Sequence, residues 1–328
     1  MQATLGTMAT DAHRSRPFRF GLTTALPRAA ADWAVFGRAV EAAGFDVLTF
    51  PDHLVPSVPP FVGATAAALA TERLRVGTLA LNNDFRHPVE TAREAAGVAT
   101  VTNGRFELGI GAGHMKSEYD AGGLTFDSGG TRVDRLVEAV DVIRPLLDGE
   151  AVDVDGSHYR VHAEAGQLVA APAERVPMLI GGNGARVLRL AGQVADIVGL
   201  SGFGHNRDAT QVRLTHFDAT GLQDRIAVVR EAAGDRFDGI ELNALIQFVV
   251  HSDDRLASAA ELAAMFGGIT PEFVLDSPFV LLGTHEQMAE TLAERRQRFG
   301  VSYWTVFDEL PGRPSTMPDI AKVIALLR

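Results

Sequence analysis

The segment Arg105-Phe106-Glu107-Leu108-Gly109-Ile110-Gly111-Ala112-Gly113-His114 is the part of the sequence that decides the fold prediction. It begins as an apolar strand and ends in alternating glycines followed by a histidine. Glycines at the end of a strand let the backbone approach a ligand that a β-carbon would block. We therefore expect a bulky ligand to dock on bare backbone here, beside the ionisable side chains of residues 116–119.

Short apolar segments of this kind recur along the chain and alternate with segments of helical spacing. Such alternation predicts parallel strands joined by right-handed helical crossovers. Eight strand–helix units in 328 residues are typical of a closed (β/α)8 TIM barrel with insertions, and an open doubly wound sheet is the alternative. The predicted strands are residues 18–24, 45–50, 75–81, the glycine-rich segment, 177–180, 195–200, 241–250 and 303–307.

Two segments depart from the alternation. Residues 152–161 alternate around Asp155-Gly156, which predicts a β-hairpin. Residues 202–220 are poorly patterned and are predicted to be an insertion near the active site. No shift in composition marks a second domain, so we expect residues 17–328 to form one barrel domain. Residues 1–16 lack the apolar core of a signal peptide and are predicted to be a disordered tail.

The composition excludes several classes of function. A net charge of -11 argues against a nucleic-acid-binding surface, which needs a basic stripe. No apolar segment is long enough to span a bilayer, so we expect no membrane association. The absence of cysteine excludes a thiolate metal site and a cysteine nucleophile, and no histidine pair has a metal-ligand spacing. We therefore predict a cytoplasmic protein without a metal centre that acts on a small molecule.

The active site of a (β/α)8 barrel lies at the C-terminal ends of its strands. His53 directly follows a predicted strand and could exchange a proton near neutral pH, or it could be a loop histidine that bonds the backbone. The polar and glycine residues at the predicted strand ends are Asp52, His53, Asn82, Asn83, Asp84, Gly111, Gly113, His114, Gly181, Gly182, Asn183, Gly184, Gln247, His251, Asp308 and Glu309.

The sequence Gly181-Gly182-Asn183-Gly184 comes directly before a predicted helix. Free amides at a helix N-terminus, helped by the helix dipole, bind anions, and a phosphate is the natural ligand. Arg186 could add positive charge there. The alternative is that these glycines only form a tight strand-to-helix turn.

Several short motifs, taken in order, resemble those of the luciferase-like monooxygenase family, the bacterial luciferase-like flavin and deazaflavin oxidoreductases. The resemblance covers nearly all of residues 18–328 and is nearest to the branch that uses coenzyme F420. Many relatives have a tryptophan where this chain has His114, and an Asn-Pro pair where it has Asn82-Asn83. The motifs are Gly44-Phe45-Asp46, Asp52-His53, Arg86-His87-Pro88, the glycine-rich segment, Gly181-Gly182-x-Gly184 and Ala195-Asp196.

This resemblance implies a role for each matching position. A non-proline cis peptide bond between Leu79 and Ala80 would bulge toward the back of the flavin ring. His53 would lie near the reactive carbon, as a proton donor or as a stabiliser of the deazaflavin anion. The implied cofactor contacts are Asp52, Asn82, Gly113 and His114 for the ring and its tail, and Gly181, Gly182, Asn183 and Gly184 for the phosphate.

The resemblance also implies an activity, that of an F420-dependent oxidoreductase. Such an enzyme transfers a hydride between C5 of the deazaflavin and a C=C, C=O or C=N bond of a small organic substrate, or runs the reverse reaction. Two alternatives stay open: an FMNH2-dependent monooxygenase on the same fold, and a non-catalytic flavin-binding relative. Relatives are often homodimers, and we expect a homodimer here.

Overall fold

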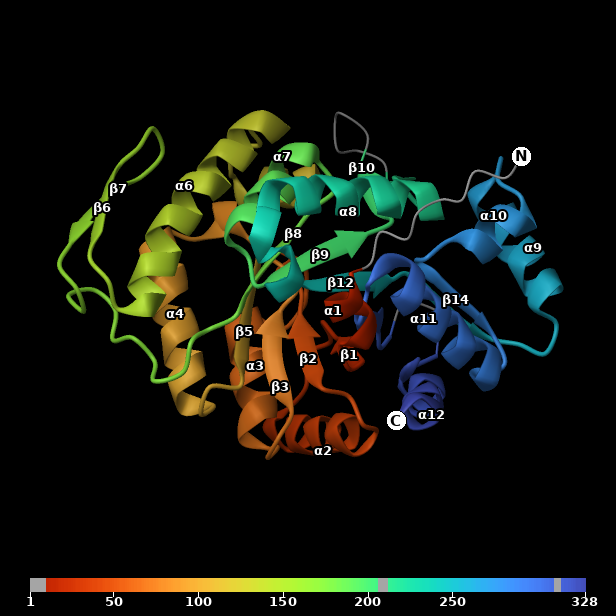
Figure 1. Ribbon diagram of the computed structural model, residues 1–328. Coiled ribbons are helices and arrows are strands. Elements are labelled where there is room, and N and C mark those ends of the chain that lie inside the picture. Colours follow the sequence, from red (N-terminus) through yellow and green to blue (C-terminus); the bar gives the residue numbers. More distant parts are fainter. Residues whose placement is uncertain (1–9, 206–211, 310–313) are drawn as a thin grey trace.

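The computed structural model describes residues 10–205, 212–309 and 314–328, and within them parallel strands close into a barrel (Figure 1). Strand β3 pairs with β5, and β15 pairs with β1, which closes the sheet. The predicted (β/α)8 barrel is therefore confirmed. Its strands are β1 (Arg19–Thr23), β2 (Val47–Phe50), β3 (Arg75–Thr78), β4 (Leu81–Asn82), β5 (Phe106–Gly111), β8 (Met178–Gly181), β9 (Ile197–Ser201), β12 (Glu241–Ile246) and β15 (Tyr303–Phe307).

Helices surround the barrel because each buries one apolar face against the strands. In α2, for example, Trp33 and Val40 are buried, and in α6 Leu136 and Val140 are buried. Neighbouring helices contact one another around the ring. The helices of this ring are α2 (Ala30–Ala42), α3 (Pro60–Leu69), α4 (Pro88–Val101), α6 (Gly129–Asp148), α7 (Ala185–Val194), α8 (Ala219–Ala233), α11 (His285–Phe299) and α12 (Met317–Leu327).

The third barrel strand is divided into two pieces, whereas the sequence predicted one strand over residues 75–81. β3 ends at Thr78 and β4 begins at Leu81, and the peptide bond between Leu79 and Ala80 is cis. β4 continues the pairing with β5, with Leu81 opposite Ile110 and Asn82 opposite Gly111. The break therefore displaces the chain locally while the barrel stays closed.

The seventh predicted strand, residues 241–250, is also divided, and the prediction of a single strand is wrong. β12 ends at Ile246, and the Gln247 amide then donates to the Phe279 carbonyl at 2.8 Å. This bond redirects the chain into β13 (Phe248–His251), which pairs with β14 (Val280–Gly283), a strand that we did not predict. Helices α9 (Arg255–Phe266) and α10 (Pro271–Asp276) complete this extension on one side of the barrel (Figure 1).

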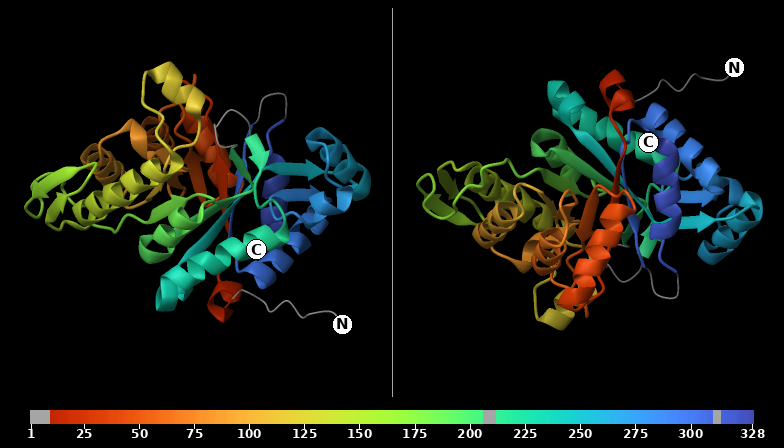
Figure 2. Two further views of the ribbon diagram at one scale, coloured as in Figure 1. Left: turned by 90° about the horizontal axis from the view of Figure 1, so that it is seen from above. Right: turned by 90° about the horizontal axis from the view of Figure 1, so that it is seen from below.

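Two antiparallel hairpins interrupt the barrel pattern. The predicted hairpin is present as β6 (Val152–Asp155) and β7 (Arg160–Ala163), and it lies at the opposite end of the molecule from α9 and α10 (Figure 2). β10 (Phe203–His205) pairs with β11 (Val212–Leu214) within the predicted insertion, of which residues 206–211 lie outside the described chain. The remaining elements are α5 (Lys116–Gly122) and the short 3-10 helices η1 (Asn83–Phe85) and η2 (Gly234–Gly239).

Part of the predicted disordered tail is ordered. Helix α1 (Asp11–Ser15) begins with a hydrogen bond from the His13 amide to the Thr10 hydroxyl. The His13 side chain is fully buried, and its Nε2 donates to the Ile240 carbonyl at 2.9 Å. The prediction of a disordered segment is therefore wrong for residues 11–15, because one histidine anchors the helix to the start of β12. Residues 1–9 lie outside the described chain.

His13 gives the stability of the protein a dependence on pH. Burial lowers the pKa of His13 from its ordinary 6.5, and the bond to Ile240 only partly opposes this. The unfolded chain therefore takes up the proton first, so the stability present above 6.5 is lost as the pH falls through the lowered pKa. One such group contributes a slope of up to about 1.4 kcal/mol per pH unit.

His13→Gln should therefore flatten the fall in the free energy of unfolding between about pH 7 and pH 5, measured by urea denaturation at a series of pH values. The wild-type slope in this variant would contradict the assignment to His13.

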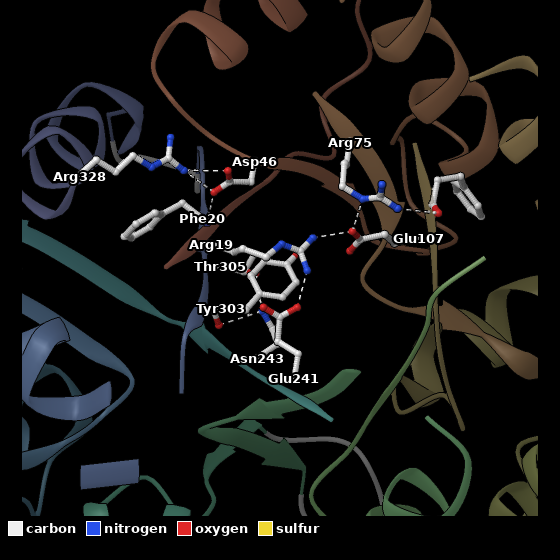
Figure 3. Close-up of polar contacts among 11 residues, drawn as sticks. Arg19, Phe20, Asp46, Arg75, Glu107, Glu241, Asn243, Tyr303, Thr305 and Arg328 are labelled. Carbon is white, nitrogen blue, oxygen red and sulfur yellow. Dashed lines mark hydrogen bonds and ion pairs between the residues drawn. The ribbon is translucent and has the colours of Figure 1, made fainter. Parts of the chain in front are cut away.

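An ion-pair network fills the N-terminal end of the barrel (Figure 3). Arg19 donates to Glu107 at 2.5 Å and also pairs with Glu241, while Arg75 donates to Glu107 at 2.5 Å. Burial raises the pKa of Glu241, and Arg19 opposes that effect. A cavity of about 570 Å³ opens beside these residues. Polar groups at this end of a (β/α)8 barrel contribute to stability, whereas chemistry takes place at the other end.

Candidate active site

The predicted site residues lie at the C-terminal ends of neighbouring strands. Asp52 and His53 follow β2, Asn82 ends β4, and Gly113 and His114 follow β5. Gly181 ends β8, and residues 182–184 connect it to α7. In the closed sheet β2 lies next to β3, β3 pairs with β5, and β5 lies between β8 and β4. The structure therefore brings these strand ends to one mouth of the barrel.

His53 forms a pair with a carboxylate that the sequence prediction missed. Its Nδ1 lies 2.8 Å from Oε1 of Glu118, on helix α5. A carboxylate accepts, so the ring donates from Nδ1, and Nε2 is the nitrogen left to exchange a proton with a ligand. Glu118 is only 4% exposed, whereas the His53 side chain is 28% exposed. The available signal was the polar segment 116–119 directly after the glycine-rich strand.

His114 stands next to this pair. Its ring meets that of His53 edge to face, with 5.7 Å between the ring centroids. His114 is exposed, and it follows the glycine-rich strand at the mouth. The structure therefore places two imidazoles and one buried carboxylate side by side, where the sequence had suggested separate histidines.

Asp52 is bound mainly by its own chain. Its carboxylate accepts from Arg86 at 2.5 Å and 3.2 Å, and from the Asn82 amide at 3.0 Å. Asp52 is buried. This carboxylate therefore ties the end of β2 to β4, directly after the cis peptide bond, and so positions the segment on which a ring could rest.

Gly113 is a glycine for a reason other than ligand access. Its φ is +73°, and an added β-carbon would collide with the Tyr119 hydroxyl and with Oδ1 of Asn82. Burial raises the pKa of Tyr119, so its hydroxyl keeps its proton and donates to Asn82 at 3.0 Å or to Asp84 at 2.9 Å. At this position the glycine leaves room for the protein's own side chains.

Gly111, two residues earlier in β5, is buried and is also surrounded by the protein's own chain. A β-carbon on Gly111 would stand 3.2 Å from the Gly181 carbonyl oxygen and 4.0 Å from Cβ of Ala80. The end of β5 therefore lies close to the end of β8 and to the cis Leu79–Ala80 bond.

Helix α7 begins with exposed backbone at its N-terminus. Gly184 is the residue before the helix, no side chain caps it, and nothing in the described chain lies within 4 Å of the position of its β-carbon. The first amides of a helix lack acceptors within the helix and bind anions. The turn therefore offers donors and open space for a phosphate.

The Asn183 side chain is already engaged. Its Nδ2 donates to the Phe203 carbonyl at 2.5 Å, and its Oδ1 accepts from Arg225. Arg225 is buried and also donates to the Ser201 carbonyl at 2.6 Å, and burial lowers its pKa to about 10. Asn183 therefore holds the turn in place, and the sequence gave no indication of the buried arginine behind it.

Arg186 points to a neighbouring helix. It pairs with Asp134 on α6 and donates to the Gly130 carbonyl at 3.4 Å. The positive charge of Arg186 that we expected at the turn is thus offset by Asp134. The amides of the helix remain the principal donors there.

The sequence of the chain also matches the model of a known protein family. The model that describes the luciferase-like monooxygenases matches residues 13–303. The chain belongs to this family. The resemblance inferred from the motifs is therefore confirmed, and the match runs from α1 through the β13–β14 extension to the start of β15.

A curated relative of this luciferase-like protein is the F420-dependent glucose-6-phosphate dehydrogenase of Nakamurella multipartita. The two are 33% identical over 251 residues, which cover 72% of this chain and 68% of the relative. Among solved structures, an F420-dependent secondary alcohol dehydrogenase with an F420–acetone adduct has a TM-score of 0.71 at 20% identity, covering 95% of this chain and all 100% of that chain.

The long-chain alkane monooxygenase LadA has a similar TM-score of 0.72 at 16% identity, covering 95% of this luciferase-like chain and 91% of LadA. Likenesses at such low identity establish the fold alone.

No helix in the described part of the chain is long and apolar enough to cross a membrane.

Proposed function

We propose that this luciferase-like protein is an F420-dependent oxidoreductase that transfers a hydride between the deazaflavin and a small organic substrate. The observation that carries the proposal is the His53–Glu118 pair, with a contact of 2.8 Å, at the mouth of the barrel. The name of the Nakamurella relative supports F420 as the cofactor.

The cofactor would be held mainly by backbone. In this proposal the first amides of α7 and the glycines at 181, 182 and 184 bind its phosphate, since the helix is uncapped and Gly184 faces open space. The ring would rest on the cis Leu79–Ala80 peptide, with His114 at its edge. Asp52, Asn82, Gly113 and the Asn183 side chain would act by keeping these backbone segments in place.

F420, when bound, supplies the carbon that gives or accepts the hydride. His53 would hold the proton that accompanies it, at Nε2, because Nδ1 is engaged by Glu118. During substrate reduction Nε2 delivers a proton, and during alcohol oxidation it accepts one. Glu118 fixes the orientation of the ring in both directions.

The rim beside His53 favours an uncharged substrate. Leu54, Val55 and Leu124 are 46%, 50% and 38% exposed. Leu54 and Leu124 both lie within 4 Å of the β-carbon position of Gly122, on the helix that carries Glu118. Two cations nearby, Arg86 and Lys116, are paired with Asp52 and Asp120. An apolar alcohol or carbonyl compound fits such a rim better than an anion does.

Titration of the purified protein with F420 and, separately, with FMN tests the cofactor. We expect tight binding of F420, followed by its fluorescence, and weaker binding of FMN. Tight binding of reduced FMN alone would instead indicate a monooxygenase, and oxygen uptake would be the next assay. Binding of neither cofactor would overturn the proposal and favour the non-catalytic alternative.

Two variants at Gly184 sharpen this test. Its φ of -81° suits any residue, and nothing in the described chain lies within 4 Å of its β-carbon position, so both variants should fold. Gly184→Asp places a carboxylate where it caps the helix and competes with the phosphate, so F420 should bind at least about 10-fold more weakly. Gly184→Ala is the control and should bind F420 nearly as the wild type does.

The expected homodimer and cytoplasmic location stay predictions. Light scattering of the purified protein would test the first.

A further inference from the structure

Three side chains with metal-binding groups meet away from the proposed catalytic pair. His251 ends β13, His285 begins α11, and Asp319 lies in the first turn of α12. One ligand atom of each lies within 4.8 Å of those of the other two. In the contacts described, none of these side chains bonds to His53 or Glu118. The sequence gave no sign of this cluster because its members come from three separate elements.

The cluster is partly organised and open to solvent. Nε2 of His285 lies 2.9 Å from Oδ1 of Asp319, and the rings of His251 and His285 stack with 4.1 Å between their centroids. The His285 side chain is largely buried, Asp319 is half-buried, and His251 is exposed. An ion could therefore enter from the His251 side, and water could complete its coordination.

The donor set selects a class of metal. Two imidazole nitrogens and one carboxylate oxygen suit Zn²⁺ and related transition-metal ions, whereas Mg²⁺ and Ca²⁺ prefer oxygen ligands throughout.

We propose that His251, His285 and Asp319 bind one divalent transition-metal ion, with Zn²⁺ as the representative ion. Zinc–ligand distances of about 2.0–2.2 Å place tetrahedral ligand atoms about 3.3–3.6 Å from one another. The His285–Asp319 contact of 2.9 Å therefore lengthens slightly, while the wider spacings in the cluster, up to 4.8 Å, shorten as the rings rotate. The exposed His251 is the side chain with most freedom to move. The bound ion joins the β13–β14 extension to the C-terminal helix.

Zn²⁺ titration calorimetry on chelator-treated protein without a histidine tag tests this site. We expect one ion per chain, and a melting temperature that rises with Zn²⁺ concentration because the ion binds the folded state. Co²⁺ is a second probe, since its visible spectrum reports nitrogen and oxygen ligands directly. His251→Gln, His285→Gln and Asp319→Asn should each weaken binding by at least about 10-fold.

His162 provides the matched control. It also pairs with a carboxylate, with Nδ1 2.6 Å from Asp153, but it lies exposed on the β6–β7 hairpin outside the cluster. His162→Gln should bind Zn²⁺ as the wild type does. His251 is exposed, so its variant should fold even if His285→Gln does not. Absence of Zn²⁺ binding in the wild type, or binding that none of the three ligand variants weakens, would overturn the proposal.

Discussion

His53→Ala is expected to lower kcat for hydride transfer by about 10²–10⁴-fold, the usual contribution of a positioned general acid or base. The cofactor is proposed to bind through the amides of α7, so the Kd for F420 should change little. The measurement is steady-state kinetics together with F420 titration of the same variant. Turnover at the wild-type rate by a variant that binds F420 normally would exclude His53 from the chemistry.

Glu118 acts on this reaction through His53. Glu118→Gln keeps the shape of the side chain but removes its charge, so the ring loses its fixed orientation, and kcat should fall by about 10-fold to 100-fold. KM should change less than kcat, because Glu118 is buried behind the ring. His162→Gln is the control, since it removes a histidine–carboxylate pair of similar geometry far from the mouth, and its kcat should equal that of the wild type. A Glu118→Gln enzyme altered only in KM would contradict the positioning role.

Gly109→Ala should destabilise the fold by about 3 kcal/mol or more. A β-carbon on Gly109 would stand well inside the van der Waals contact distance of the Thr78 carbonyl oxygen, and 3.0 Å from its carbonyl carbon. The Thr78 hydroxyl also bonds both the amide and the carbonyl of Gly109, at 2.8 Å and 2.7 Å. Thr78 ends β3 and Gly109 lies in β5, and the pairing of these two strands closes the barrel. The two strands therefore have no freedom to separate.

Gly97→Ala is the matched control for this substitution. Gly97 is exposed within α4, and nothing in the described chain lies within 4 Å of its β-carbon position. Alanine there should raise the free energy of unfolding by about 0.5–1 kcal/mol. Urea denaturation of both variants measures the difference. A Gly109→Ala protein as stable as the wild type would show that β3 and β5 can separate without cost.

The glycine-rich strand shows where sequence reasoning succeeds and where it stops. Its pattern located the strand correctly, because alternating small and apolar residues before a polar segment are a local property. The reason given for its glycines was incomplete. Gly109 and Gly113 accommodate Thr78 and Tyr119 of the same chain, and only contacts between distant segments could reveal this.

The division of the seventh strand has a similar cause. Residues 241–250 are uniformly suited to a strand, and nothing local marks the exit from the barrel at Gln247. The exit depends on a distant partner: the Phe279 carbonyl, directly before β14, accepts from Gln247, and β14 itself offers a second sheet edge. In the same way helix α1 is ordered by one distant carbonyl, that of Ile240.

The sequence by itself determined the alternation of the barrel's eight strands with helices, the family, and the gathering of Asp52, His53 and the glycine turns at one mouth. It could do so because parallel strands in a closed barrel place their C-terminal ends together, whatever their side chains are. The tertiary structure decided which side chains pair there: Glu118 with His53, Arg86 with Asp52, and Arg225 with Asn183. Such pairs join residues from separate elements, and their geometry exists only once those elements have packed.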